Sequence, residues 1–249
     1  MKIIITMVCV LVALLVIVVA AALYHIKKMP GNAAPYHLEN VESLAESPLQ
    51  GKRILFLGSS VTYGAQSLQT SMADYIEKLD GCTVVKEALS GTTLSTAKSN
   101  SYVKRLLKVD TAQTFDAVVV QLSTNDATQG LTLGTVGDSK DMESFDTETI
   151  LGAMEYIIAY CEDTWHCPVL IYTGTKYDSE AYAAMVAAMP QLQEKWGVDI
   201  IDLWNDAEMN AVSDKDYALY MGDSIHPTQA GYLQWWTPKF EEHLYKLFA

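Results

Sequence analysis

The chain has 249 residues, half of them hydrophobic, and a formal net charge of −13. This length suffices for one large α/β domain with a single well-developed core. The negative charge argues against a polyanion such as nucleic acid as a partner. The sequence also lacks a basic patch interleaved with aromatic residues, which agrees with that conclusion.

The first 28 residues predict a membrane anchor or a signal segment. Residues 3–23 are apolar except for Thr6, a run long enough to cross a bilayer as a helix. Alanines at positions 20–22 would suit a signal peptidase, but the run is longer than a usual signal h-region, which favours an uncleaved transmembrane helix. The two lysines after the run alone would favour a cytoplasmic domain. A short amino terminus commonly stays inside, however, so we expect the domain to be extracytoplasmic, or secreted if the segment is cleaved.

Residues 29–50 contain several prolines with little periodicity and predict a linker, which leaves residues 51–249 as one domain. In this domain, apolar segments of strand length alternate with helical patterns. The predicted strands are residues 53–57, 83–87, 117–122, 169–172 and 199–203, and the predicted helices are residues 71–79, 102–107, 148–161, 179–196 and 228–248. This alternation predicts a three-layer α/β/α domain, a doubly wound sheet of about five parallel strands.

Two features interrupt or accompany this pattern. Residues 127–146 form an irregular, glycine-containing stretch after the third strand, and loops of this length are usually functional or mobile. Cys161 and Cys167 either pair outside the cell or remain two thiols flanking a turn. The cysteine and histidine spacing does not suggest a zinc site.

Ser60 follows the first predicted strand directly, within the sequence Gly58-Ser59-Ser60-Val61-Thr62-Tyr63-Gly64. The carboxyl ends of parallel strands open onto a crevice, so a serine there is a candidate nucleophile. It still needs a base, an orienting acid and donors for an oxyanion. The Gly-x-Ser-x-Gly elbow of α/β-hydrolases is absent.

His226 is the histidine best placed to be the base, because Asp223 precedes it by three residues and a strand and loop lead back to the same edge. The other histidines flank the membrane segment, lie in the linker, precede a strand at the opposite edge, or lie in the last helix without an acid three residues before: His25, His37, His166 and His243. An isolated Asp-x-x-His pair often occurs by chance.

Two further residues make the pair more specific. Gly91 follows the second strand and could donate its backbone N–H to an oxyanion, and Asn125 follows the third and could donate its side-chain amide. Either residue alone is typical of a turn. Because all these segments follow strands, the predicted fold would bring them to one crevice.

These segments resemble the four blocks of the SGNH (GDSL-type) hydrolase superfamily, which contain Ser, Gly, Asn and His in this order. The resemblance covers residue 52 to the C-terminus. It implies that Ser60 is the nucleophile, that Asp223 and His226 complete a catalytic triad, and that Ser60, Gly91 and Asn125 form the oxyanion hole. This chemistry requires neither a metal nor an organic cofactor.

The chain departs from the family pattern at two positions. Ser59 stands where the family usually has Asp, and Ser123 stands where it usually has Gly. Both changes leave the catalytic roles in place but bear on the shape of the crevice, and therefore on the substrate class.

The expected function is that of a serine esterase that cleaves carboxylic esters through an acyl-enzyme. An anchored, exported esterase would encounter O-acetyl groups on extracellular or cell-wall carbohydrate, and Tyr63, Tyr177, Trp204 and residues 127–146 could line its crevice. Core packing is the alternative for these aromatic residues. An O-acyltransferase or a non-hydrolytic glycan-binding surface protein on the same fold are the alternative functions.

Overall fold

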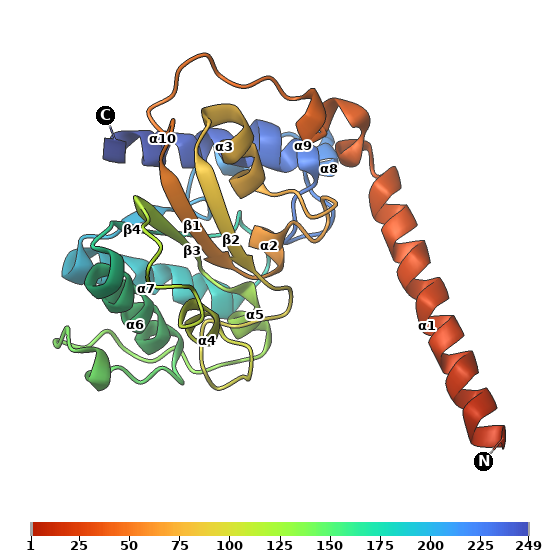
Figure 1. Ribbon diagram of the computed structural model, residues 1–249, viewed down its shortest axis with the longest axis horizontal. Helices are drawn as coiled ribbons and strands as arrows, with labels where there is room; N and C mark the ends of the chain where they lie inside the picture. The colour runs from red at the N-terminus through yellow and green to blue at the C-terminus, as the bar shows by residue number, and fades with distance from the viewer. Residues whose placement is uncertain (1, 249) are drawn as a thin grey trace.

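The computed structural model describes residues 2–248 and shows a central parallel sheet between two layers of helices (Figure 1). Its strand order is β2-β1-β3-β4-β5, and every neighbouring pair is parallel. The strands are β1 (Arg53–Gly58), β2 (Thr83–Ala88), β3 (Ala117–Gln121), β4 (Val169–Tyr172) and β5 (Asp199–Ile201). The predicted doubly wound α/β domain is therefore confirmed.

Alternate residues of the strands face two separate apolar cores. Leu55 and Leu57 of β1 belong to the core covered by α4 (Tyr102–Leu106), α6 (Ile150–Trp165) and α7 (Glu180–Trp196). Ile54 and Phe56 belong to the other core, which α3 (Met72–Asp80) and α10 (Thr237–Phe248) cover. A strand buried on both faces explains the continuous apolar runs in the sequence.

The predicted last helix, residues 228–248, is helical from Gln229 to Phe248 but contains a π-helical turn that was not predicted. The structure divides it into α9 (Gln229–Gly231), the π-helix η6 (Tyr232–Trp236) and α10. Pro238 lies in the first turn of α10 and has no N–H to donate to the preceding turn, which favours a wider turn there. The π-helix also places Tyr232 and Trp236 in the core.

The remaining helices are short and were not predicted as separate elements. They are α2 (Ser60–Tyr63), α5 (Thr124–Thr128), η4 (Met142–Ser144), η5 (Met209–Ala211) and α8 (Asp214–Tyr220). Most of them follow strands at the carboxyl edge of the sheet or lie in long connections. Of these, α2 and α5 begin within three residues of the ends of β1 and β3 and therefore lie at the carboxyl edge of the sheet.

The apolar helix α1 (Lys2–Lys28) projects away from the domain (Figure 1). Its segment Val10–Lys28 has a mean hydropathy of 2.4 and is long and apolar enough to cross a membrane. None of that segment is buried against the rest of the protein. These properties fit a membrane anchor, and they equally fit a signal sequence.

The predicted linker contains three short 3-10 helices, η1 (Pro30–Asn32), η2 (Ala34–Tyr36) and η3 (Leu38–Asn40). Part of it packs against the domain: Asn32 is buried, and the Tyr36 carbonyl accepts a hydrogen bond from Tyr75 Oη at 2.5 Å. The division of the chain at residues 28 and 50 stays a prediction.

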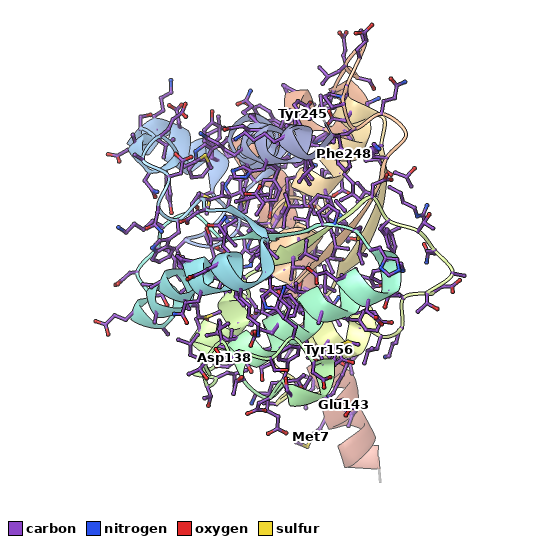
Figure 2. All side chains as sticks on the ribbon, turned by 90° about the vertical axis from the view of Figure 1, so that its left-hand side faces the viewer. Met7, Asp138, Glu143, Tyr156, Tyr245 and Phe248 are labelled. Carbon is purple, nitrogen blue, oxygen red and sulfur yellow. The ribbon has the colours of Figure 1, made fainter. Side chains whose placement is uncertain are left out.

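Residues 127–146 pack on the outer side of α6 and α7. Leu131, Val136 and Phe145 cover the apolar core at these helices, and Figure 2 shows Asp138 and Glu143 on the same side as Tyr156 of α6. This loop therefore extends the helical layer of that face.

In the part of the chain that the structure describes, Cys161 and Cys167 are buried free thiols, which is the second of the two alternatives for this pair.

Candidate active site

Ser60 lies at the tight turn between β1 and α2. The turn continues through Gly64, whose φ of +83° lies in the left-handed region and whose N–H bonds the Ser60 carbonyl at 3.0 Å. A Cβ at Gly64 would lie 2.6 Å from the Thr70 carbonyl oxygen, so the turn needs glycine for conformation and for space. The strand and the turn together hold the serine at the carboxyl edge of the sheet.

Ser60, His226 and Asp223 form a continuous chain of hydrogen bonds. Ser60 Oγ lies 2.7 Å from His226 Nε2, and His226 Nδ1 lies 2.9 Å from both carboxylate oxygens of Asp223. A proton on Nδ1 satisfies the carboxylate and leaves Nε2 free to accept from the serine. The structure therefore brings these three predicted residues together, in the order that an activated serine requires.

The loop that carries Asp223 and His226 is closed on itself. Met221 and Pro227 form an antiparallel bridge, and the N–H of Gly222 donates to the His226 carbonyl at 2.8 Å. Such closure limits how far the imidazole can move relative to the acid.

Asp223 is held in its ionised form. Burial opposes ionisation, but hydrogen bonds from the His226 ring and from the backbone N–H groups of Ile225 and His226 outweigh it and lower the pKa of Asp223 to about 2. A carboxylate accepting several hydrogen bonds favours its charged form in this way. Asp223 is therefore an anion throughout the neutral range.

The segments of Gly91 and Asn125 are joined by a hydrogen bond to Thr92, the residue that follows Gly91. Asn125 Nδ2 donates to the Thr92 carbonyl at 2.9 Å, and Gly91 has a φ of +79°. Since an amide nitrogen carries two hydrogens, one remains for another acceptor. The structure thus brings the second and third predicted segments together.

Asp126, which the sequence analysis did not single out, fixes this contact. Its carboxylate accepts from the backbone N–H groups of Leu94 at 2.8 Å and Ser95 at 3.1 Å. Burial raises the pKa of Asp126, while these two bonds and one from Ser123 oppose the rise. Its position next to Asn125 was visible in the sequence, but its partners in the segment after β2, Leu94 and Ser95, were not.

Gln121, which the sequence analysis also did not identify, holds the serine turn through hydrogen bonds. Its Oε1 accepts from the Ser59 N–H at 2.9 Å and from Thr62 Oγ1 at 2.8 Å, and its Nε2 donates to Ser59 Oγ at 3.1 Å. Gln121 is 1% exposed at the end of β3. An amide that ends an apolar strand was the signal that could have identified it.

Arg105 joins the serine turn to the loop of Gly91. One of its terminal nitrogens donates to the Gly58 carbonyl at 2.6 Å and to Thr92 Oγ1 at 3.2 Å, and the other donates to the Glu87 carbonyl at 2.7 Å. Burial lowers the pKa of this guanidinium, while the neighbouring Tyr102 and Glu87 oppose that shift. Its position in α4 gave no sequence signal.

The aromatic residues predicted for the crevice differ in their surroundings. Trp204 is 6% exposed and packs edge-on against Tyr177 with ring centroids 5.4 Å apart. It therefore belongs to the core, which was the alternative interpretation. Tyr63 and Tyr177 remain partly exposed.

Solved structures of similar fold include bacterial proteins of low sequence identity. A Lactobacillus plantarum protein is 22% identical with a TM-score of 0.66, covering 80% of this chain and 99% of that one. A protein from Bacteroides ovatus assigned to the GDSL-like lipases is 17% identical with a TM-score of 0.59, covering 79% and 99%. A family two carbohydrate esterase from Clostridium thermocellum, solved with cellohexaose, is 14% identical with a TM-score of 0.55, covering 82% and 65%.

At these identities the similarity establishes the fold alone, and no match was found among curated proteins. The sequence itself decides the family. The model of the GDSL-like Lipase/Acylhydrolase family matches residues 56–233, which include the serine turn, both loops joined through Thr92, and the loop of His226. The chain therefore belongs to the GDSL-like lipase/acylhydrolase family and is an ester hydrolase.

Proposed function

We propose that this protein is a serine esterase that acts through an acyl-enzyme, with Ser60 as its nucleophile, His226 as general base and Asp223 as the orienting acid. The hydrogen-bond chain from Ser60 Oγ to His226 and on to Asp223 carries this proposal. Ser60 is only 8% exposed, so the residue is largely screened from bulk water.

The reaction begins when Ser60 Oγ bonds to the ester carbonyl carbon and its proton passes to His226 Nε2. Asp223 stabilises the resulting imidazolium. The carbonyl oxygen becomes negative and accepts from the N–H groups of Ser60 and Gly91 and from the free amide hydrogen of Asn125. His226 then protonates the leaving alcohol, and water releases the acyl group by the same steps in reverse roles.

The proposed substrate is an O-acetyl carbohydrate. A carbohydrate esterase has the same fold, and aromatic side chains suited to sugar faces lie near the loop of His226. A cavity of about 300 Å³ is lined in part by Tyr217 of α8, Trp235 of η6 and Lys176 after β4. The ring centroids of Tyr217 and Trp235 are 6.4 Å apart. The helix α8 ends at Tyr220, three residues before Asp223, so the cavity is lined by the element that precedes the loop of Asp223 and His226.

The apolar helix α1 gives the proposed enzyme its location. We propose that it anchors the protein with the catalytic domain outside the cytoplasm, where acetylated wall or extracellular polysaccharides are found. Cleavage within residues 20–22 would instead release the domain.

Two assays test the proposal on the full chain in detergent micelles. Hydrolysis of p-nitrophenyl acetate by the wild type, and its loss in Ser60→Ala, tests the nucleophile. A panel of acetylated xylan, cello-oligosaccharides and peptidoglycan, measured by acetate release, tests the substrate class. Turnover of short aryl esters without acetate release from any glycan would leave the esterase standing and refute the carbohydrate substrate.

A further inference from the structure

Asn32 lies shortly after the apolar helix α1, is 2% exposed, and bonds three separate segments. Its Nδ2 donates to the carbonyls of Ile26 and Gln66, both at 2.8 Å, and its Oδ1 accepts from the N–H of Gln229 at 2.9 Å. Both amide hydrogens and the amide oxygen are thus hydrogen-bonded. A buried side chain with this many partners fixes the relative positions of the groups it joins.

Two of these partners belong to the loops that carry the site. Gln66 follows the turn of Ser60, and Gln229 follows His226 closely in sequence. The amide of Asn32 therefore links the segment that follows Ser60 to the segment that follows His226.

The side chain of Gln66 continues this connection to the acid. Its Nε2 lies 3.4 Å from Asp223 Oδ2, and a Cβ added at Gly222 would lie 2.7 Å from Gln66 Cβ. The backbone of Gln66 is bonded to Asn32 while its side chain packs directly against the residue before Asp223. A displacement of Gln66 would therefore disturb its contacts with Gly222 and with the carboxylate of Asp223.

The segment after Ser60 needs such support because its backbone is strained. Leu68 has a φ of 56° and Gln69 a φ of 68°, both in the left-handed region that side chains with a Cβ rarely adopt. Conformations of this kind persist only where surrounding contacts hold them. The bond from Asn32 to the Gln66 carbonyl is one such contact.

Gly31 confirms how closely the segment before the domain fits against the loop of the base. A Cβ at Gly31 would lie 2.1 Å from the Leu219 carbonyl oxygen and 2.2 Å from Thr228 Oγ1. These two groups bond each other at 2.7 Å and flank the loop of Asp223 and His226. The backbone of the predicted linker therefore touches both ends of that loop.

We propose that Asn32 is a positioning residue for the esterase reaction, which acts through Gln66 to hold Asp223 and His226 in line with Ser60. The inference rests on the proposed roles of these three residues. The segment that follows the membrane helix is then part of the catalytic unit. A cap for the last turn of α1, through the Ile26 carbonyl alone, is the competing role.

A phosphonate with a p-nitrophenyl leaving group separates these roles. Ser60 Oγ bonds to phosphorus, p-nitrophenolate departs, and His226 takes the serine proton. The amplitude of p-nitrophenol release counts folded sites, whereas the rate constant reports how well the serine is activated. A purely structural role for Asn32 lowers the amplitude and leaves the rate constant unchanged.

Three variants of the full chain in detergent micelles complete the test. Asn32→Ala should lower the rate constant by about tenfold to about a hundredfold, the scale for a small misplacement of reacting groups, and lower kcat with little change in KM. Gln66→Met removes the donor to Asp223 but keeps the backbone carbonyl and the side-chain length, so it should also slow the reaction. Asn40→Ala is the matched control, because the Asn40 side chain is exposed and donates to the Ala34 carbonyl within the same segment.

The double variant tests whether Asn32 acts through Gln66. Its rate constant should fall by clearly less than the product of the two single effects, because the second change disturbs a connection already broken. Multiplicative effects, or a rate constant in Asn32→Ala equal to that of Asn40→Ala, would overturn the inference. If Asn32→Ala yields no titratable sites, Gln66→Met decides alone, and an unchanged rate constant overturns it. A wild type that does not react would instead refute the proposed function.

Discussion

Asn125→Ala tests the proposed oxyanion hole, the part of the site that would distinguish this family from a generic serine hydrolase. Asn125 Nδ2 donates one hydrogen to the Thr92 carbonyl at 2.9 Å, and in the proposed mechanism its second hydrogen would bond the substrate oxygen. That bond strengthens as charge builds in the transition state. Removing one such donor typically costs about 10²–10³ in kcat, or about 3–4 kcal/mol, and should leave KM nearly unchanged.

Ser123→Ala is the matched control for this measurement. Ser123 Oγ caps α5 by accepting from the Asp126 N–H, so its loss should cost about 1 kcal/mol of stability without removing an oxyanion donor. Asn125→Ala also loses its bond to Thr92, which brings the two variants to similar stability. They should therefore differ in turnover and not in thermal midpoint.

The assay is p-nitrophenyl acetate hydrolysis, with kcat expressed per site titrated by the phosphonate. Asn125→Asp should be at least as impaired as the alanine variant, because a carboxylate repels the developing negative charge. If both Asn125 variants turn over at near wild-type rates per titrated site, Asn125 is a turn residue and the oxyanion hole is made by other groups.

Three further predictions concern the nucleophile, the base and a distant carboxyl pair. Ser60→Ala should abolish esterase activity with little change in thermal midpoint, whereas Ser59→Ala should retain most activity; the reverse pattern would identify Ser59 as the nucleophile. Activity should increase with pH because only a neutral imidazole at His226 can accept the serine proton, and Asp223, whose pKa is about 2, stays ionised throughout; a flat profile with chemistry limiting would contradict a histidine base. Burial and the nearby charge of Asp80 raise the pKa of Glu241 to about 7, so its neutral form stabilises the fold below the unfolded value of 4.5 and that contribution is lost as pH rises through 7. Glu241→Gln should therefore raise the thermal midpoint at pH 8 and change it little at pH 4, and an equal change at both pH values would count against this assignment.

The fold was predictable because its signal is local. Each strand lies between two helical layers, so residues such as Leu55 and Phe56 are both buried and the apolar run is continuous. Parallel strands also end at one edge, which is why Ser60, Gly91 and Asn125 could be expected near one another from chain order alone.

The supports of the site were not predictable because their partners are distant in sequence. The packing of the sheet and the helical layers brings together residues far apart in sequence: Gln121 and Ser59, Arg105 and Gly58, and Asn32 and Gln229. His243 shows the same limit: no acid lies three residues before it, yet its Nδ1 lies 2.6 Å from Asp199 Oδ2. Spacing along the chain reports contacts within an element and is silent on these.

The structure also shows how the serine turn is held at position 59, where the family usually has Asp. Ser59 lies next to the backbone N–H that Ser60 would offer to the oxyanion, and its hydroxyl is bonded by the neutral amide of Gln121 at 3.1 Å. A carboxylate there would add negative charge beside the place where the oxyanion forms. Arg105, which donates to the Gly58 carbonyl at 2.6 Å, adds positive charge on the same side. In the proposed mechanism, a neutral support and a nearby buried cation would favour the developing anion, so serine at position 59 is compatible with an oxyanion hole at this turn.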